Sequence, residues 1–191
     1  MPTQYYTASS LDGFIATEDD SIEWLFPLAD VNATSYPLFI AEVGALAMGS
    51  ATYEWMLRNV IKPAAGDAAP WPYTQPTWVF SSRELEPVEG ATIHMVRGDV
   101  RPVHAAMTQA AAERNVWLVG GGDLVGQFYD AGLLDEIIVQ LGSVTLGRGK
   151  PLLPRRIDGA KALRLTAVKH FGPGMAELRY DVSRSTDEAT L

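Results

Sequence analysis

Short apolar runs alternate with stretches of helical periodicity along the chain. The apolar runs have the pattern of buried strands and lie at residues 45–48, 77–80, 92–96, 115–119 and 135–142. Apolar residues at helical spacing predict helices at residues 32–43, 53–60, 103–114 and 124–131. Strands that alternate with helices in this way favour an α/β fold with a mostly parallel sheet.

The two ends of the chain add further strands. An early strand is predicted over residues 4–8. Two late strands, residues 162–170 and 175–182, are joined by a Gly-Pro-Gly turn that favours an antiparallel hairpin. We therefore expect one domain over residues 1–183 and a disordered tail over residues 184–191.

The sequence also indicates where the first helix begins and ends, and where a long loop lies. Asn32 is a plausible N-cap for the first helix, and Gly44 is expected to end that helix. Residues 62–76 contain four prolines and an Ala- and Gly-rich run. A loop of this length in a compact domain is more often functional than not, so the sequence predicts a surface flap here.

Composition and charge narrow the classes of function. The formal net charge is −8, which would repel nucleic acid and anionic membrane surfaces. No apolar stretch approaches the roughly 20 residues that a membrane helix needs. Cysteine is absent, which removes thiolate chemistry and fits a cytoplasmic protein. His94, His104 and His170 are isolated in the sequence, so no metal site is expected.

Three consecutive glycines form the most specific feature of the chain. Gly120, Gly121 and Gly122 follow a buried strand and precede a helix. Glycines let the backbone approach a pyrophosphate, and the helix start offers free amides and a positive dipole end. Val125 stands where a Rossmann fingerprint has its last glycine, so that fingerprint is absent. A tight packing turn is the alternative, but it needs fewer glycines.

Two other strand ends carry small or hydroxylated residues. Gly49, Ser50 and Thr52 lie between a strand and a helix, where the hydroxyls could cap the helix or contact phosphate. The second strand end is the run 81–83, Ser-Ser-Arg, which is either a polar turn or an anion contact. Together with the three glycines, these ends are expected to meet at the carboxyl edge of one sheet, where α/β proteins bind ligands.

The order of five motifs resembles the dihydrofolate reductase superfamily. The motifs are SLDGFIA, MGSATYEW, VFSS, LVGGGDLVGQF and LLDEIIVQLGSVTLGRGKPLL. Within the superfamily, the chain is similar to stand-alone proteins that resemble the C-terminal reductase domain of bifunctional riboflavin-biosynthesis deaminase/reductases. The resemblance implies a three-layer α/β/α dihydrofolate reductase-like fold, with a mostly parallel central sheet and an antiparallel C-terminal hairpin. It also implies a homodimer.

The resemblance implies NADPH as the cofactor and matches its parts to residues of this chain. Ala8 and Ile15 would flank the nicotinamide. Around the phosphates would lie Gly120, Gly121, Gly122, Asp123, Leu124 and Val125, with Gly49, Ser50, Ala51 and Thr52 on the other side. Ser81, Ser82 and Arg83 match the turn that holds the adenosine ribose and its 2′-phosphate. The family commonly has arginine at the position of Ser50, and Arg83 is expected to compensate for its absence.

Two carboxylates are candidates for the proton that accompanies hydride transfer to a C=N bond. Asp12 belongs to the SLDG motif, and its alternative role is to bond the backbone of its own turn. Asp30 ends a segment similar to the folate enzymes' Trp-x-x-Pro-x-Asp, with one extra residue.

Three residues are candidates for substrate contacts. Trp24 lies in a loop beside the predicted pocket. Arg148 and Lys150 are either contacts to an anionic substrate group or solvated surface cations.

The sequence thus favours an NAD(P)H-dependent reductase of a small heterocycle, either pteridine-like or pyrimidine-like. It would resemble dihydrofolate reductase or 5-amino-6-(5-phosphoribosylamino)uracil reductase. The alternative is an NADPH-binding protein without efficient turnover that regulates a partner. Both functions would use the same glycines.

Overall fold

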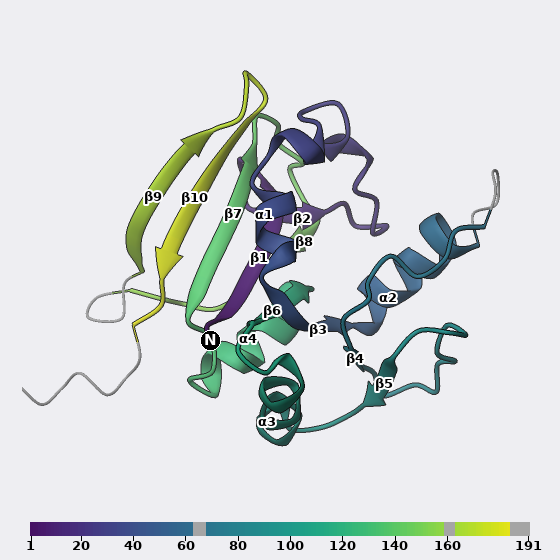
Figure 1. The fold of residues 1–191 in the computed structure, drawn as a ribbon. Helices are drawn as coiled ribbons and strands as arrows, with labels where there is room; N and C mark the ends of the chain where they lie inside the picture. The colour runs from purple at the N-terminus through teal and green to yellow at the C-terminus, as the bar shows by residue number, and fades with distance from the viewer. Residues whose placement is uncertain (63–67, 159–162, 184–191) are drawn as a thin grey trace, which may run out of the picture.

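Two sheets and four α-helices make up the part of the chain that the computed structural model describes, residues 1–62, 68–158 and 163–183 (Figure 1). The strands are β1 (Thr3–Ser10), β2 (Phe14–Ala16), β3 (Val43–Gly49), β4 (Thr77–Phe80), β5 (Ile93–Val96), β6 (Asn115–Gly120), β7 (Glu136–Gly142), β8 (Lys150–Pro151), β9 (Arg164–His170) and β10 (Met175–Asp181). The helices are α1 (Tyr36–Ala41), α2 (Ser50–Met56), α3 (Val100–Ala111) and α4 (Gly122–Asp130). Shorter helical turns are η1 (Glu23–Leu25), η2 (Val31–Ala33) and the π-helical η3 (Leu57–Ile61).

The larger sheet has the strand order β5-β4-β3-β6-β1-β7-β10-β9. The strands from β5 to β7 are parallel to their neighbours, whereas β10 is antiparallel to both β7 and β9. β2 and β8 pair separately. The predicted parallel sheet with an antiparallel C-terminal hairpin is therefore confirmed.

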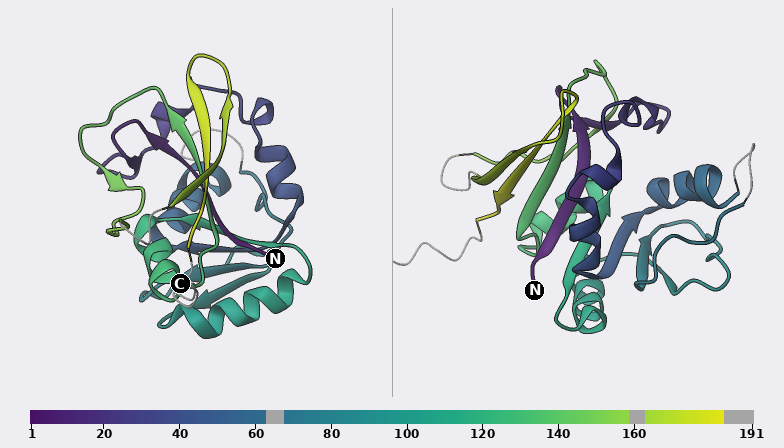
Figure 2. Two further views of the ribbon diagram at one scale, coloured as in Figure 1. Left: turned by 90° about the vertical axis from the view of Figure 1, so that its left-hand side faces the viewer. Right: turned by 45° about the horizontal axis from the view of Figure 1, so that its top comes forward.

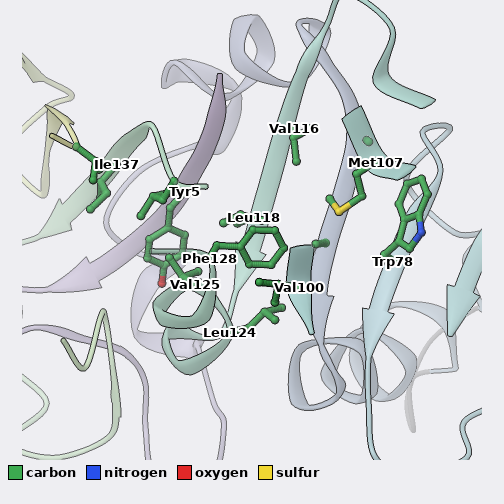
Figure 3. Close-up of a cluster of buried hydrophobic side chains, with 14 of the residues drawn as sticks. Tyr5, Trp78, Val100, Met107, Val116, Leu118, Leu124, Val125, Phe128 and Ile137 are labelled. Carbon is green, nitrogen blue, oxygen red and sulfur yellow. The ribbon is translucent and has the colours of Figure 1, made fainter. Parts of the chain in front are cut away.

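Helices cover both faces of this sheet because successive side chains of each strand point to opposite sides. Tyr5 belongs to a cluster with residues of α3 and α4 (Figure 3), whereas Tyr6 packs with Phe39 of α1. Figure 2 shows α1 and α4 on opposite sides of the sheet. The three-layer α/β/α arrangement is thus confirmed. None of the described helices is long and apolar enough to cross a membrane.

Aromatic rings hold α1 and a neighbouring loop against the sheet. Tyr6 stacks on Phe39 with ring centroids 4.3 Å apart, and Trp117 meets Phe39 edge-on at 5.4 Å. Tyr73 meets Trp117 at 5.6 Å, and Trp71 lies 5.6 Å from Tyr73. The described part of the predicted flap, residues 68–76, therefore carries rings that pack onto the sheet. Residues 63–67 of the flap, like the predicted tail 184–191, lie outside the described residues.

The first predicted helix is shorter than expected. It comprises the turn η2 and then α1, with Asp30 rather than Asn32 capping the turn through a 2.9 Å bond to the Asn32 amide. Pro37 lies in the first turn of α1, where proline is tolerated, whereas it would break the interior of a helix that began at residue 32.

The prediction for Gly44 was wrong, because this residue lies within β3. It serves close packing instead. A β-carbon at Gly44 would lie 2.6 Å from the Ala111 carbonyl oxygen and 2.7 Å from the Ala111 α-carbon. Helix α3 thus approaches β3 at a distance that leaves no room for a side chain.

Gly44→Ala should therefore destabilise the protein. We expect the free energy of unfolding, measured by urea denaturation, to fall by about 2 kcal/mol because the backbone of α3 must move. Gly49→Ala on the same strand is the matched control: its β-carbon would lie 3.8 Å from the nearest atoms, so the change should stay below about 0.5 kcal/mol. Equal stability of the two variants would contradict this packing.

Candidate functional site

The carboxyl ends of β3 and β6 meet at glycines. Met48 is paired with Gly120, and a β-carbon on Gly49 would lie 3.8 Å from both the Gly120 oxygen and the Gly121 nitrogen. Gly120 has a φ of +140°, which side chains rarely permit, and the Gly120–Gly121 peptide is cis. The structure thus brings together two segments that the sequence matched to the cofactor phosphates.

The three consecutive glycines have different surroundings. A β-carbon on Gly122 would lie 2.6 Å from the Leu152 oxygen, so this glycine is required for packing against the residue that directly follows β8. Gly120 and Gly121 have space in front of them: the nearest atoms to their β-carbon positions are Thr52 Oγ1 at 3.9 Å and Ile15 Cδ1 at 4.0 Å. The packing alternative therefore applies to Gly122. Gly121 is partly exposed, whereas Gly120 is buried beside it.

Helix α4 presents its first turn at this point. Gly121 is its N-cap and supplies no side-chain hydrogen bond, so no cap satisfies the first amides. The side chains of Leu124 and Val125 are buried in the core, whereas Asp123 is exposed. Leu124 and Val125 could thus contact a ligand only through their backbone.

Arg83 joins the end of β4 to the start of α2. Its guanidinium contacts both carboxylate oxygens of Glu54 at 2.9 and 2.7 Å, and it lies 3.3 Å from Ser50 Oγ. The hydrogen bonds to Glu54 raise the pKa of Arg83 further above its ordinary value. Ser81 Oγ accepts a 3.0 Å bond from the Arg83 amide and fixes the turn, in which Ser82 is exposed. A permanent cation therefore stands beside Ser50, while Ala51 next to it is exposed.

The central strand is open near its carboxyl end. Residues 3–6 and 9–10 of β1 are buried, but Thr7 and Ala8 are partly exposed. β1 has neighbours on both sides, β6 and β7, so this exposure comes from a gap in the layers that cover the sheet. Ile15, which approaches Gly121, is also partly exposed. The two predicted nicotinamide neighbours are thus accessible.

Trp24 packs over the end of β7. Its ring carbon Cζ3 lies 3.0 Å from the β-carbon position of Gly142, which is paired with Ser10 of β1. Its indole nitrogen is buried and has no hydrogen-bond partner among the described residues, and the same holds for Trp71. A buried unpaired donor costs about 1–3 kcal/mol.

Asp12 is held by a loop rather than left free. Its carboxylate accepts hydrogen bonds from Ser10 Oγ at 2.6 Å, from the Gly147 amide at 2.7 Å and from the Leu146 amide at 3.0 Å. The Ser10 bond and these amides lower the pKa of Asp12 below its ordinary value. A carboxylate held as an anion is a poor proton donor, so these contacts favour a structural role.

Asp30 lies in a different place from the glycines. It lines a pocket of about 410 Å³ with residues of its own segment and of the β9–β10 turn: Leu28, Ala29, Ala33, Thr34, His170, Phe171 and Gly172. None of these residues belongs to the open end of β1, β3 or β6. The structure therefore does not bring Asp30 together with the cofactor candidates.

Arg148 and Lys150 pair with acidic residues of the loop after β2. Arg148 lies 3.5 Å from Glu18, and Lys150 lies 3.5 Å from Asp20. All four side chains are at least one-third exposed. These ion pairs favour the interpretation that Arg148 and Lys150 are solvated surface cations, not substrate contacts.

The sequence analysis missed Glu54 and a buried polar group around Glu177. Glu54 lies within the MGSATYEW motif, but its partner Arg83 is 29 residues away and only the fold joins them. Glu177 carried a signal, because Glu177 and Arg179 alternate with apolar residues in β10 and share one face of the strand.

Known proteins resemble this chain in sequence over most of its length. The sequence model of the RibD C-terminal domain matches residues 4–176. The uncharacterised protein YwjB of Bacillus subtilis (strain 168) is 31% identical over 178 residues, which cover 93% of this chain and 96% of YwjB.

Solved structures share the fold. A candidate riboflavin biosynthesis protein from Shewanella sp. PV-4 superposes with a TM-score of 0.78 at 23% identity, covering 96% of this chain and all of that one. Dihydrofolate reductase from Enterococcus faecalis, complexed with NADP(H) and RAB-propyl, superposes with a TM-score of 0.59 at 19% identity, covering 96% of each chain. The chain therefore belongs to the RibD C-terminal domain family.

Proposed function

We propose that this protein is an NADPH-dependent reductase that transfers hydride to a small heterocycle. The observation that carries the proposal is the partly exposed Gly121, which lies with Gly120 beside Gly49, and the position of Arg83 next to Ser50. When bound, NADPH would supply the hydride. The protein's part is to bind the cofactor, orient it and exclude water.

The glycines and the start of α4 would hold the pyrophosphate. Backbone amides can approach phosphate oxygens closely where no β-carbon intervenes, and the helix dipole favours negative charge at this end. Thr52 stands 3.9 Å from the β-carbon position of Gly120, so its hydroxyl is available to the same anion. The nicotinamide would then lie against Ala8 and Ile15.

Arg83 would recognise the 2′-phosphate that distinguishes NADPH from NADH. Its guanidinium lies 3.3 Å from Ser50 Oγ. The turn of Ser81 and Ser82 would hold the adjoining ribose. Glu54 neutralises part of the charge of Arg83, so the phosphate must compete with this carboxylate.

The half of the site for the substrate suits a planar ring. Trp24 and Trp71 are partly exposed. The exposed part of each ring could stack on a flat compound, and a pteridine- or pyrimidine-like ring offers such flat faces.

A homodimer in the cytoplasm stays a prediction. Sedimentation of the purified protein would test the assembly.

The affinity for the two cofactors tests the function. We expect NADPH to bind at least tenfold more tightly than NADH, because a charge-assisted hydrogen bond contributes about 1.5–3 kcal/mol. Arg83→Ala should abolish this preference without changing the Kd for NADH. The measurement is a fluorescence titration of each cofactor.

Arg101→Ala provides the matched control for Arg83→Ala. Arg101 is also an exposed, ion-paired arginine: its side chain is 62% exposed and that of Arg83 is 59% exposed, but Arg101 pairs with Asp99 at the start of α3. We expect no effect on either Kd. Equal affinity of the wild type for NADPH and NADH would refute the NADPH preference, and NADPH binding without NADPH oxidation across a panel of heterocycles would favour the non-catalytic alternative.

Asp12→Asn tests the role of the SLDG aspartate. Because the pKa of Asp12 is lowered in the folded protein, its stabilising effect is present above the unfolded pKa, about 4, and is lost as pH falls through the folded value. The melting temperature of the variant should therefore be lower than that of the wild type at pH 7, and the gap should narrow below about pH 4. An unchanged melting temperature with lost turnover would instead identify Asp12 as the proton donor.

A further inference from the structure

A fully buried carboxylate lies beneath α1, at the side of the proposed site. Glu177 of β10 has no exposed surface. Its Oε1 accepts a 2.9 Å bond from Arg179 Nε, and its Oε2 accepts bonds from Ser35 Oγ and, at 3.4 Å, from Gln140 Nε2. The ion pair with Arg179 makes Glu177 a hydrogen-bond acceptor only.

The carboxylate determines how the Gln140 amide is turned. A group that only accepts must face the NH₂ side of a neighbouring amide, not its carbonyl. Gln140 Nε2 also donates to the Tyr6 hydroxyl, whose pKa burial raises to about 12, so this phenol keeps its proton. Tyr6 can in turn donate to Ser35 at 3.3 Å. The hydrogen bonds of this group are thus all donated in the direction of Glu177, from Gln140, Tyr6 and Ser35.

The Gln140 carbonyl oxygen is left for another partner. It accepts no hydrogen bond from the residues of the described ranges. It is also not among the buried side-chain atoms that lack a partner there, which are Gln4 Oε1, Trp24 Nε1 and Trp71 Nε1, so it keeps some contact with solvent.

The same amide stands next to the open position of β1. Gln140 is paired with Ala8 on one side and with Glu177 on the other, so the three residues form a row across β1, β7 and β10 on one face of the sheet. Adjacent strands are about 4.8 Å apart, which places Gln140 within reach of a ring bound against Ala8.

We propose that Glu177 is a positioning residue that turns the Gln140 carbonyl toward the substrate, so that the site selects a planar heterocycle with a ring N–H. This inference rests on the proposed function, since it assumes that the substrate lies against Ala8. Glu177 itself touches no substrate.

Two probes, one with ring N–H groups and one with these groups methylated, test the selection. 5,6-Diaminouracil has ring N–H donors, and its 1,3-dimethyl derivative has none. NADPH-loaded wild type should bind the first at least about tenfold more tightly by calorimetry, as expected for a buried acceptor left without its donor. Equal binding of the two probes, or binding of neither, would overturn the proposal.

Glu177→Gln should remove the discrimination, because a neutral amide at this position can also donate and so no longer fixes Gln140. We expect the ratio of the two dissociation constants to fall to within about twofold, with the Kd for NADPH unchanged. Should this variant not fold, Gln140→Met, which removes the carbonyl at similar volume, is expected to give the same loss. Full discrimination in a folded variant would overturn the proposal.

Glu136→Gln is the matched control. Glu136 accepts a 2.6 Å bond from Gln4 on the same strands and lies 3.9 Å from Arg179, but Gln4 is four residues from Ala8 along β1, about 13 Å away. The ratio of the two probe dissociation constants for Glu136→Gln should match that of the wild type. Absence of NADPH binding in the wild type would refute the proposed function, whereas normal NADPH binding without probe discrimination would refute this inference alone.

Discussion

The candidate site depends on one close approach of two backbones. At the carboxyl ends of β3 and β6, no side chain separates Gly49 from Gly120 and Gly121. Any larger residue at Gly120 would need a φ that side chains rarely adopt and would project toward Thr52. The free amides of α4 therefore stand at an accessible point, and the open part of β1 is the next strand along.

In the proposed function, the charge of Arg83 would select the cofactor. Arg83 lies beside the start of α2 because β4 ends there. Arg148 and Lys150 have acidic partners on the loop after β2. The negative net charge of the chain is thus compatible with binding a small polyanion, because the local contact rather than the total charge decides affinity at short range.

Periodicity alone predicted most of the fold, and turn chemistry predicted the glycine site. The strands at residues 77–80 and 115–119 are close to β4 and β6, since buried parallel strands have continuous apolar runs. Contacts between distant residues were not predictable: Asp12 bonds amides 134 and 135 residues away, and Gly44 is fixed by Ala111. The first helix is shorter than predicted because of Pro37, which the sequence also shows. The prediction gave more weight to the spacing of the apolar residues than to this proline.

A crystal structure with NADPH would test the central claim most directly. We expect the pyrophosphate to lie on the backbone of Gly120 and Gly121, the 2′-phosphate beside Arg83 and the nicotinamide against Ala8 and Ile15. Density for the cofactor elsewhere, such as in the pocket of Asp30 and His170, would contradict it.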